Sequence, residues 1–279
     1  MPRVIRAVTR VPRGRWAREQ ALCYLRSYDV MYVQLAALML ALVAMGVFAV
    51  RPASSTRGIN ARIAKHDSGP FLGRFLVEYA YWLLSPVAQL AASLRLSPNV
   101  SSWASLILGI SSGIAAGFGA VPLAGGLIII SALFDTLDGM LARSQGIASD
   151  AGEVLDAAVD RYTEFFFLTG LCLYYRHEPW AMVLVQAALL GSMLMSYTQA
   201  KAEAMRVDIP RGWMRRPERI TYLGSGAFLS PIVTVWFEAG DPIPLHYPLP
   251  FAAMLVAVFA NAAAIRRFMV LYAMAKARR

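Results

Sequence analysis

Long apolar runs constrain this chain more than any other feature of its sequence. Runs of about 18 residues or more indicate helices that cross a membrane, because lipid offers no partners for open backbone hydrogen bonds. The composition agrees, with 58% hydrophobic and 16% charged residues, whereas a soluble domain carries about 25% charged residues. The sequence therefore predicts an all-α, polytopic membrane helix bundle. The expected spans are 31–50, 100–120, 122–142, 154–175, 180–204, 220–237 and 251–272.

The first 70 residues differ from the rest of the chain. Residues 1–30 contain seven arginines and predict a basic leader, and 51–70 form a polar linker after the extra apolar segment 31–50. Charged and polar residues interrupt the apolar pattern of 71–94, which favours a helix lying in the membrane interface. We therefore expect a leader, an extra membrane segment and a linker in 1–70, and a membrane domain in 71–279.

The net charge of +10 is typical of basic loops that contact anionic lipid headgroups. Because these residues are divided among loops between apolar spans, nucleic acid is not an expected partner. Cys23 and Cys172 form no CxxC motif, so neither a disulfide framework nor a cysteine metal site is expected.

The topology of the extra segment is ambiguous. If 143–152 and 201–219 face the cytoplasm, a single crossing at 31–50 places the arginine-rich leader outside, against the positive-inside rule. Either 31–50 enters the membrane and returns to the same side, or the leader is an exception. The sequence leaves both arrangements open.

Four aspartates lie at or inside the ends of two apolar spans, and burying a charge at membrane depth costs about 2.5–3.5 kcal/mol. Asp135 and Asp138 share one helix face, separated by roughly 4.5 Å along the axis, and Asp156 and Asp160 share another, separated by roughly 6 Å. One interpretation places these acids, solvated, at headgroup level. In the other interpretation the two faces lie opposite each other, and their carboxylate oxygens bind hard cations. Two such cations suit a displacement reaction at phosphorus.

Small residues accompany the acids. Gly139 and Ala142 follow Asp138 on its helix face, and Gly152 precedes Asp156 by one turn. They either admit a bulky polar substrate close to the backbone or allow tight packing between helices.

The spacing of eight of these residues resembles the signature of the CDP-alcohol phosphatidyltransferase family. The resemblance covers 71–275 and implies six spans after an interfacial helix, a homodimer, and two Mg²⁺ or Mn²⁺ ions per active site. It also implies an inner-membrane enzyme, with its site toward the cytoplasm, that transfers a phosphatidyl group from CDP-diacylglycerol or a similar CDP-lipid to an alcohol and releases CMP. The signature residues are Asp135, Asp138, Gly139, Ala142, Arg143, Gly152, Asp156 and Asp160.

Roles for individual residues follow from the same resemblance. Asp160 is the expected general base that takes the proton from the acceptor hydroxyl. The expected metal ligands are Asp135, Asp138, Asp156 and Asp160. The expected contacts with CDP are Asn99, Ser102, Asp138, Gly139, Ala142, Arg143 and Gly152.

The acceptor is less constrained. The segments 196–203 and 216–219 resemble phosphatidylinositol-phosphate synthases, although Gln199 replaces a lysine of those enzymes and Lys201 an arginine. This similarity favours inositol phosphate or a related polyol, with glycerol 3-phosphate or another alcohol as alternatives. The basic residues of 201–219 equally suit a positive-inside loop. The expected acceptor contacts are Arg161, Lys201, Arg216 and Arg219.

A cation transporter is the alternative from another class, since intramembrane acids also mark ion paths. Transporters place such acids near the membrane midplane, whereas here they gather toward one side beside a basic loop. The intact signature also disfavours an inactive scaffold.

Overall fold

The structure, a computed structural model, describes residues 15–50, 73–209, 213–238 and 244–277, with the side chains of 15–30 and 73–74 left undescribed. Within these ranges all regular structure is helical, which confirms the predicted fold class. The arginine-rich leader up to residue 14, the linker and Arg211 lie outside the described residues. The helices are α2 (Arg15–Ala49), α4 (Gly73–Ser93), α5 (Pro98–Gly117), α6 (Val121–Ser144), α7 (Asp150–Tyr174), the short 3-10 helix η2 (Tyr175–His177), α8 (Pro179–Met205), α9 (Arg216–Phe228), α10 (Ser230–Phe237) and α11 (Pro248–Ala277).

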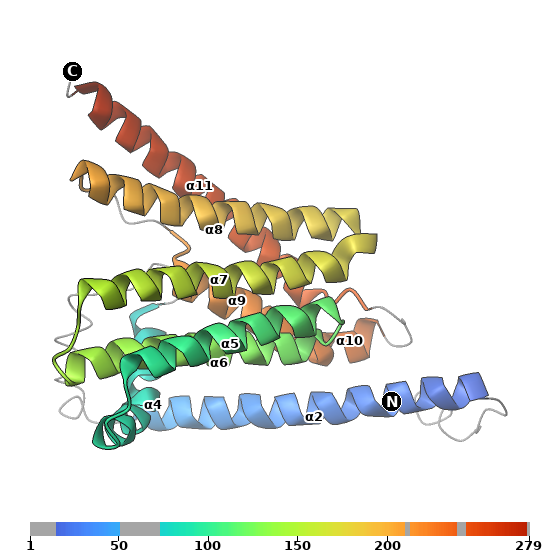
Figure 1. Ribbon diagram of the computed structural model, residues 1–279. Helices are drawn as coiled ribbons and strands as arrows, with labels where there is room; N and C mark the ends of the chain where they lie inside the picture. Colours follow the sequence, from blue (N-terminus) through green and yellow to red (C-terminus); the bar gives the residue numbers. More distant parts are fainter. Residues whose placement is uncertain (1–14, 51–72, 210–212, 239–243, 278–279) are drawn as a thin grey trace.

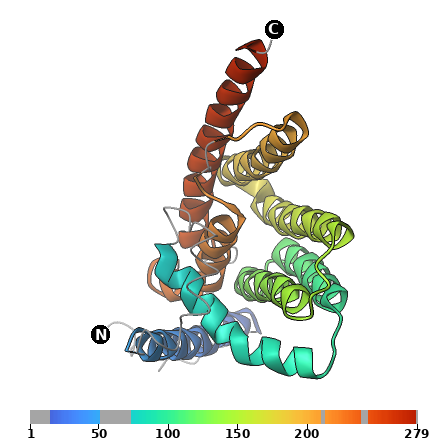
Figure 2. The ribbon, with the colours of Figure 1, turned by 90° about the vertical axis from the view of Figure 1, so that its left-hand side faces the viewer.

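Helices α5 to α9 run side by side as a bundle, with α11 crossing it obliquely (Figure 1). Helix α4 lies across one end of this bundle (Figure 2), as expected for an interfacial helix. The same end holds the loop between α6 and α7, so the carboxyl end of α6 and the amino end of α7 meet there. We call it the site end.

Small residues bring the central helices close together. Ser105 of α5 and Ser131 of α6 each donate a hydrogen bond to the other's carbonyl oxygen, at 2.9 and 2.8 Å. On another face of α5, a Cβ added to Gly109 would lie 2.5 Å from Cγ2 of Thr163 on α7. Association of helices in lipid depends on such packing and polar contacts, and here they hold α6 and α7 on either side of α5.

By length and composition, five helical segments among the described residues are able to cross a membrane: Met31–Ala49, α5, α6, α8 and α11. The pair α9–α10 is long and apolar enough to count as a sixth if the two helices form one bent span, whereas the sequence predicts one unbroken span over 220–237. A bend of 41° divides it at Leu229, and Pro231, which lacks an N–H donor, opens α10 just after the bend. Helix α7, where the sequence predicts the span 154–175, is not among these segments. Three charged residues, Asp160, Arg161 and Glu164, interrupt its apolar run.

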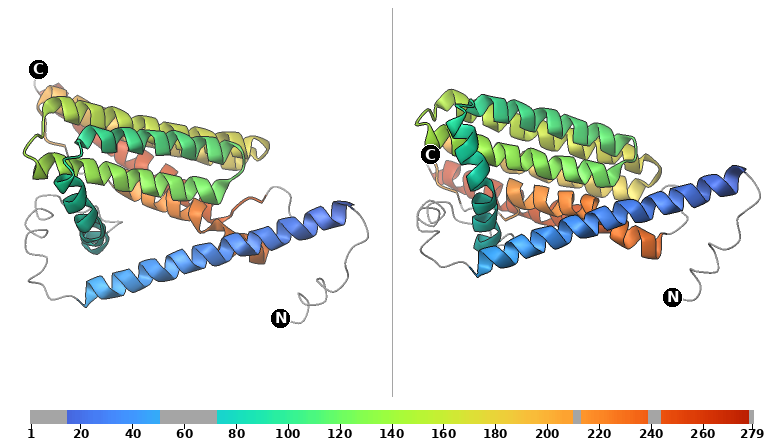
Figure 3. Two further views of the ribbon diagram at one scale, coloured as in Figure 1. Left: turned by 60° about the horizontal axis from the view of Figure 1, so that its bottom comes forward. Right: turned by 90° about the horizontal axis from the view of Figure 1, so that it is seen from below.

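Helix α2 is continuous and packs beside the bundle against α10 and α4. Its carboxyl end lies near α4 at the site end, and its amino end projects past the opposite end (Figures 1 and 3). The segment 31–49 therefore does not turn back on itself. Of the two arrangements that the sequence leaves open, the continuous helix favours a single crossing over a segment that returns to the same side.

Candidate active site

The start of α7 is formed by residues suited to a helix amino terminus. The hydroxyl of Ser149 accepts a hydrogen bond from the backbone N–H of Gly152 at 3.2 Å, and Asp150 and Glu153 lie in the first turn. A capping oxygen and negative charge both stabilise this end of a helix. The cap fixes where α7 begins, and Asp156 and Asp160 follow about two and three turns later.

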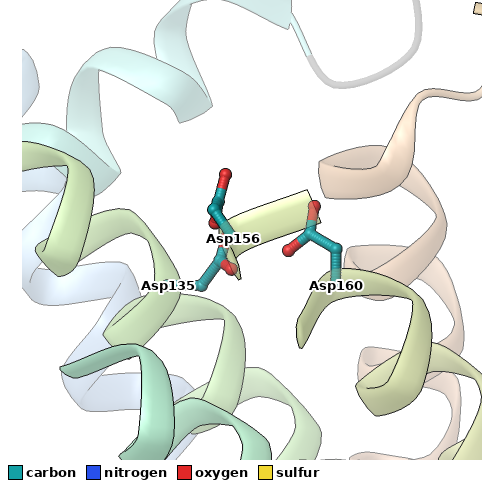
Figure 4. A group of neighbouring side chains, drawn as sticks. All are labelled: Asp135, Asp156 and Asp160. Atoms are coloured by element: carbon teal, nitrogen blue, oxygen red, sulfur yellow. The ribbon is translucent and has the colours of Figure 1, made fainter. Parts of the chain in front are cut away.

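Three of the four predicted metal ligands form a cluster. One carboxylate oxygen from each of Asp135, Asp156 and Asp160 lies within 4.8 Å of the others, and Figure 4 shows the three groups turned toward a common space between α6 and α7. Oδ1 of Asp135 is buried without a hydrogen-bond partner among the described residues. Buried anionic oxygens without donors are costly. Oxygen ligands of this kind suit Mg²⁺ or Mn²⁺, so these residues fit a divalent metal.

Arg216 of α9 contacts the acidic cluster directly. Its Nη1 donates a hydrogen bond to Oδ2 of Asp135 at 2.6 Å and lies 2.5 Å from Oδ1 of Asp160, while Nη2 donates to Oγ1 of Thr163 at 3.2 Å. The sequence predicts Arg216 as an acceptor contact. The structure pairs its guanidinium with two of the predicted metal ligands, so that Arg216 joins α9 to α6 and α7.

Asp138 lies outside this three-residue cluster. It is buried, and its Oδ2 accepts a hydrogen bond from the hydroxyl of Ser102 at 2.5 Å. Asp138 and Asp156 both line a pocket of about 490 Å³ at the site end. The pocket thus opens beside the acidic cluster, with Asp156 common to both.

Six of the seven residues predicted to contact CDP line this pocket. The exception is Arg143, whose exposed guanidinium folds back on Gly139; a Cβ added to that glycine would lie 3.0 Å from Nη1 of Arg143. The absence of a Cβ at Gly139 therefore leaves room for this arginine at the pocket's edge. The pocket is lined by Ser97, Pro98, Asn99, Ser102, Asp138, Gly139, Ala142, Ile147, Ala148, Ser149, Asp150, Gly152, Glu153 and Asp156.

The residues predicted to bind the acceptor are dispersed. Arg161 donates a hydrogen bond to the carbonyl of Ala157 on its own helix, and Lys201 is exposed at the end of α8. Arg219 is 3% exposed, and its Nε and Nη2 donate to the two carboxylate oxygens of Glu164 at 2.7 and 2.8 Å. A two-pronged pair of this kind fixes both partners. Arg219 therefore joins α9 to α7 inside the bundle.

Sequence reasoning missed a buried arginine in the last helix. Arg267 of α11 is 7% exposed, and its Nη1 donates to the carbonyl of Met195 on α8 at 3.4 Å. It lies close enough to Arg215 and Arg219 for their charges to act on it. The signal was present in the sequence, because Arg266 and Arg267 interrupt the apolar run 251–272, and an ionisable residue inside a span indicates a functional site.

Comparisons with known proteins agree with this geometry. Residues 95–275 match the CDP-alcohol phosphatidyltransferase family. The phosphatidylinositol phosphate synthase of Corynebacterium glutamicum is 32% identical over 149 residues, which are 50% of this chain and 65% of that protein. The synthase of Mycobacterium tuberculosis H37Rv is 31% identical over 170 residues, 58% of this chain and 75% of the relative.

Solved structures of the Mycobacterium tuberculosis synthase share the fold. Its apo form superposes with a TM-score of 0.57 at 25% identity, covering 67% of this chain and 95% of that one. A form in complex with manganese and citrate gives 0.58 at 24% identity, covering 67% of this chain and 88% of that one.

This chain therefore belongs to the CDP-alcohol phosphatidyltransferase family. It is a multi-pass membrane transferase that moves a phosphatidyl group from a CDP-linked lipid to an alcohol with the help of a divalent metal. The predictions of family, reaction class and metal dependence are confirmed, and the cation-transporter alternative has no support.

Proposed function

We propose that this enzyme transfers the phosphatidyl group of CDP-diacylglycerol to a phosphorylated inositol or a closely related polyol phosphate, at the site end of the bundle. The observation that supports a phosphorylated acceptor is that Arg267 of α11 lies close enough to Arg215 and Arg219, which flank Arg216 in the sequence, for their charges to act on it. The similarity to the phosphatidylinositol phosphate synthases of Corynebacterium glutamicum and Mycobacterium tuberculosis supports the same acceptor class.

The donor would bind with its nucleotide in the pocket and its diphosphate at the acidic cluster. Asp135, Asp156 and Asp160 would hold the metal, and Asp138, turned toward the same pocket, would complete a site for two ions. When bound, the metal neutralises the diphosphate oxygens and stabilises the CMP leaving group. Ser102 would keep the Asp138 carboxylate oriented through its 2.5 Å hydrogen bond.

Asp160 would accept the proton of the attacking hydroxyl. Its carboxylate belongs to the acidic cluster and contacts Arg216 of α9, so an acceptor arriving from the α9 side would come within reach of it. Arg216 would hold the acceptor in that approach, because its guanidinium already bridges Asp135 and Asp160. The reaction then needs no covalent protein intermediate.

The acceptor phosphate would lie beside Arg267 and Arg215. Arginine favours phosphate recognition, since its planar fork matches phosphate oxygens, and Arg267 brings a positive charge deep between α8 and α11. Arg219, engaged with Glu164, would position α9 and add charge to this region. Lys201 and Arg161 remain candidate contacts at its margin.

An acceptor panel tests this proposal. Purified enzyme with CDP-diacylglycerol and Mn²⁺ should release CMP with inositol 1-phosphate, and more slowly with inositol, glycerol 3-phosphate or glycerol. Because a hydrogen bond to a charged group contributes about 1.5–3 kcal/mol, Arg267→Gln should raise the KM of the phosphorylated acceptor about 10- to 100-fold. The KM of CDP-diacylglycerol should stay the same. Preference for an unphosphorylated polyol, or an equal change in both KM values, would contradict the proposed phosphate site.

We further propose that the site end lies on the cytoplasmic side of the inner membrane. Because the amino end of α2 lies at the opposite end of the bundle, it would then lie outside the cytoplasm. A single cysteine introduced at residue 2 in a cysteine-free background should react with an impermeant maleimide in intact cells. A single cysteine introduced at Ser149, in the loop at the site end, should react only after lysis. Labelling of both positions in intact cells, or of neither, would refute this topology. The homodimer stays a prediction.

A further inference from the structure

Helix α2 lies outside the part of the chain that matches the family. It nevertheless packs against α10 and α4, and it does so along one face. In its described part, Met31, Gln34 and Phe48 are buried, each 8% exposed or less. On the other face Leu40 and Val43 are 72% and 58% exposed. The spacing of the buried residues follows one helical stripe, so α2 docks on the protein through a defined surface.

The carboxyl end of this surface is an aromatic contact with α4. The ring of Phe48 lies 5.4 Å from that of Phe75, 5.8 Å from that of Tyr79 and 5.5 Å from that of Trp82. The hydroxyl of Tyr79 also donates a hydrogen bond to the carbonyl of Ala41 on α2 at 3.2 Å. Phe75, Tyr79 and Trp82 share one face of α4 at helical spacing, and Phe48 contacts all three.

The second half of α4 packs on the helix that carries two of the acids. Ala88 and Ala91 of α4 form a buried cluster with Leu137 and Leu141 of α6, and these leucines flank Asp138 in the sequence. Pro86 lies between the two halves of α4 and removes a backbone donor there. Helix α4 is therefore held at one half by α2 and at the other by α6.

The end of α4 leads directly into the nucleotide pocket. Leu96 follows α4, and its carbonyl accepts a hydrogen bond from Nε2 of Gln145 at 2.9 Å. The next two residues, Ser97 and Pro98, line the pocket and begin α5. A shift of α4 would thus move this wall of the pocket relative to Asp138.

We infer that α2 is a positioning element of the active site: Phe48 fixes α4, and α4 sets the wall of the pocket that receives the CDP-linked donor. Phe48 itself touches no substrate. This inference depends on the CDP-linked donor that the family uses, and it does not depend on the proposed acceptor. The role of α2 and the identity of the acceptor can therefore be refuted separately.

Donor affinity in the full-length enzyme tests it, measured as the Kd of CDP-diacylglycerol in detergent and as its KM. Because contacts that couple distant sites are worth about 0.5–2 kcal/mol, Phe48→Ala should weaken donor affinity about 2- to 30-fold. The KM of the acceptor and the thermal midpoint should change little. Phe48→Tyr, which keeps the ring, should restore affinity. Val47→Ala, at an exposed neighbour on the same helix, is the matched control.

Two results would overturn the inference. One is a donor affinity in Phe48→Ala equal to that of Val47→Ala. The other is a parallel loss of thermal stability and of both substrate affinities, which would make α2 a purely structural addition. If Phe48→Ala does not accumulate, Tyr79→Phe, which removes only the hydrogen bond to Ala41, decides by the same criteria. An enzyme that binds donor but ignores every polyol phosphate would refute the proposed acceptor alone.

Discussion

Asp160→Asn is expected to reduce CMP release about 10²- to 10⁴-fold, the contribution of a well-placed general base. The amide keeps the shape of the side chain but accepts no proton and binds cations weakly. The variant should fold as well as the wild type, because it removes one of three clustered carboxylates and so relieves repulsion among them. The measurement is CMP release from labelled CDP-diacylglycerol, with Mn²⁺ or Mg²⁺ varied over a wide range.

The control is Asp208→Asn, the same chemical change at an exposed position after α8 that does not line the pocket. It should leave the rate and the metal dependence unchanged. Chelation of the metal should abolish release by the wild type, and added Mn²⁺ should restore it. If Asp160→Asn retained more than about a tenth of the wild-type rate, Asp160 would not be the base.

Glu164→Ala is expected to lower the free energy of unfolding by about 3–5 kcal/mol, because it leaves the buried charge of Arg219 without its partner. Glu164 and Arg219 are 2% and 3% exposed and joined by two hydrogen bonds. The loss should lower the thermal midpoint in detergent by on the order of 10 °C. Since the same pair joins α7 to α9, activity should fall with it.

Glu203→Ala provides the comparison, since it truncates a glutamate on α8 whose hydrogen bond from Gln199, at 2.7 Å, is exposed. Exposed polar pairs are worth at most about 1 kcal/mol, so this variant should unfold within a few degrees of the wild type. The double variant Glu164→Ala, Arg219→Met should recover much of the lost stability, because no buried charge is left over. Equal midpoints for Glu164→Ala and Glu203→Ala would show that the buried pair stabilises nothing.

Helix formation and the spacing of the acids could be predicted because both depend on short stretches of chain. An apolar run long enough to cross a membrane must close its hydrogen bonds as a helix. The 3.6-residue period places Asp156 and Asp160 on one face whatever surrounds them. The start of α5 lies within two residues of the expected span, and the polar and charged residues that interrupt the apolar pattern of α4 are an equally local signal.

Contacts between helices were beyond the same reasoning. Arg216 and Asp135 are 81 positions apart in the sequence, and Arg219 and Glu164 are 55 apart. Contacts over such separations leave no pattern in any single segment. The bend at Leu229 was missed because a proline in the first turn of a helix is tolerated, so the apolar pattern runs through it. Arg267 was visible as an interrupting charge, but its neighbours on α8 and α9 were not.

By itself, the sequence determined which segments are helices and which acids share a face, because hydrogen bonding and helical period act over a few residues. The tertiary structure alone decided which faces meet. Lipid surrounds apolar surfaces as well as neighbouring helices do, so hydrophobicity selects no partner. Close contacts among small, polar and aromatic side chains make that choice, and they place Arg216 at the carboxylates and Phe48 against α4.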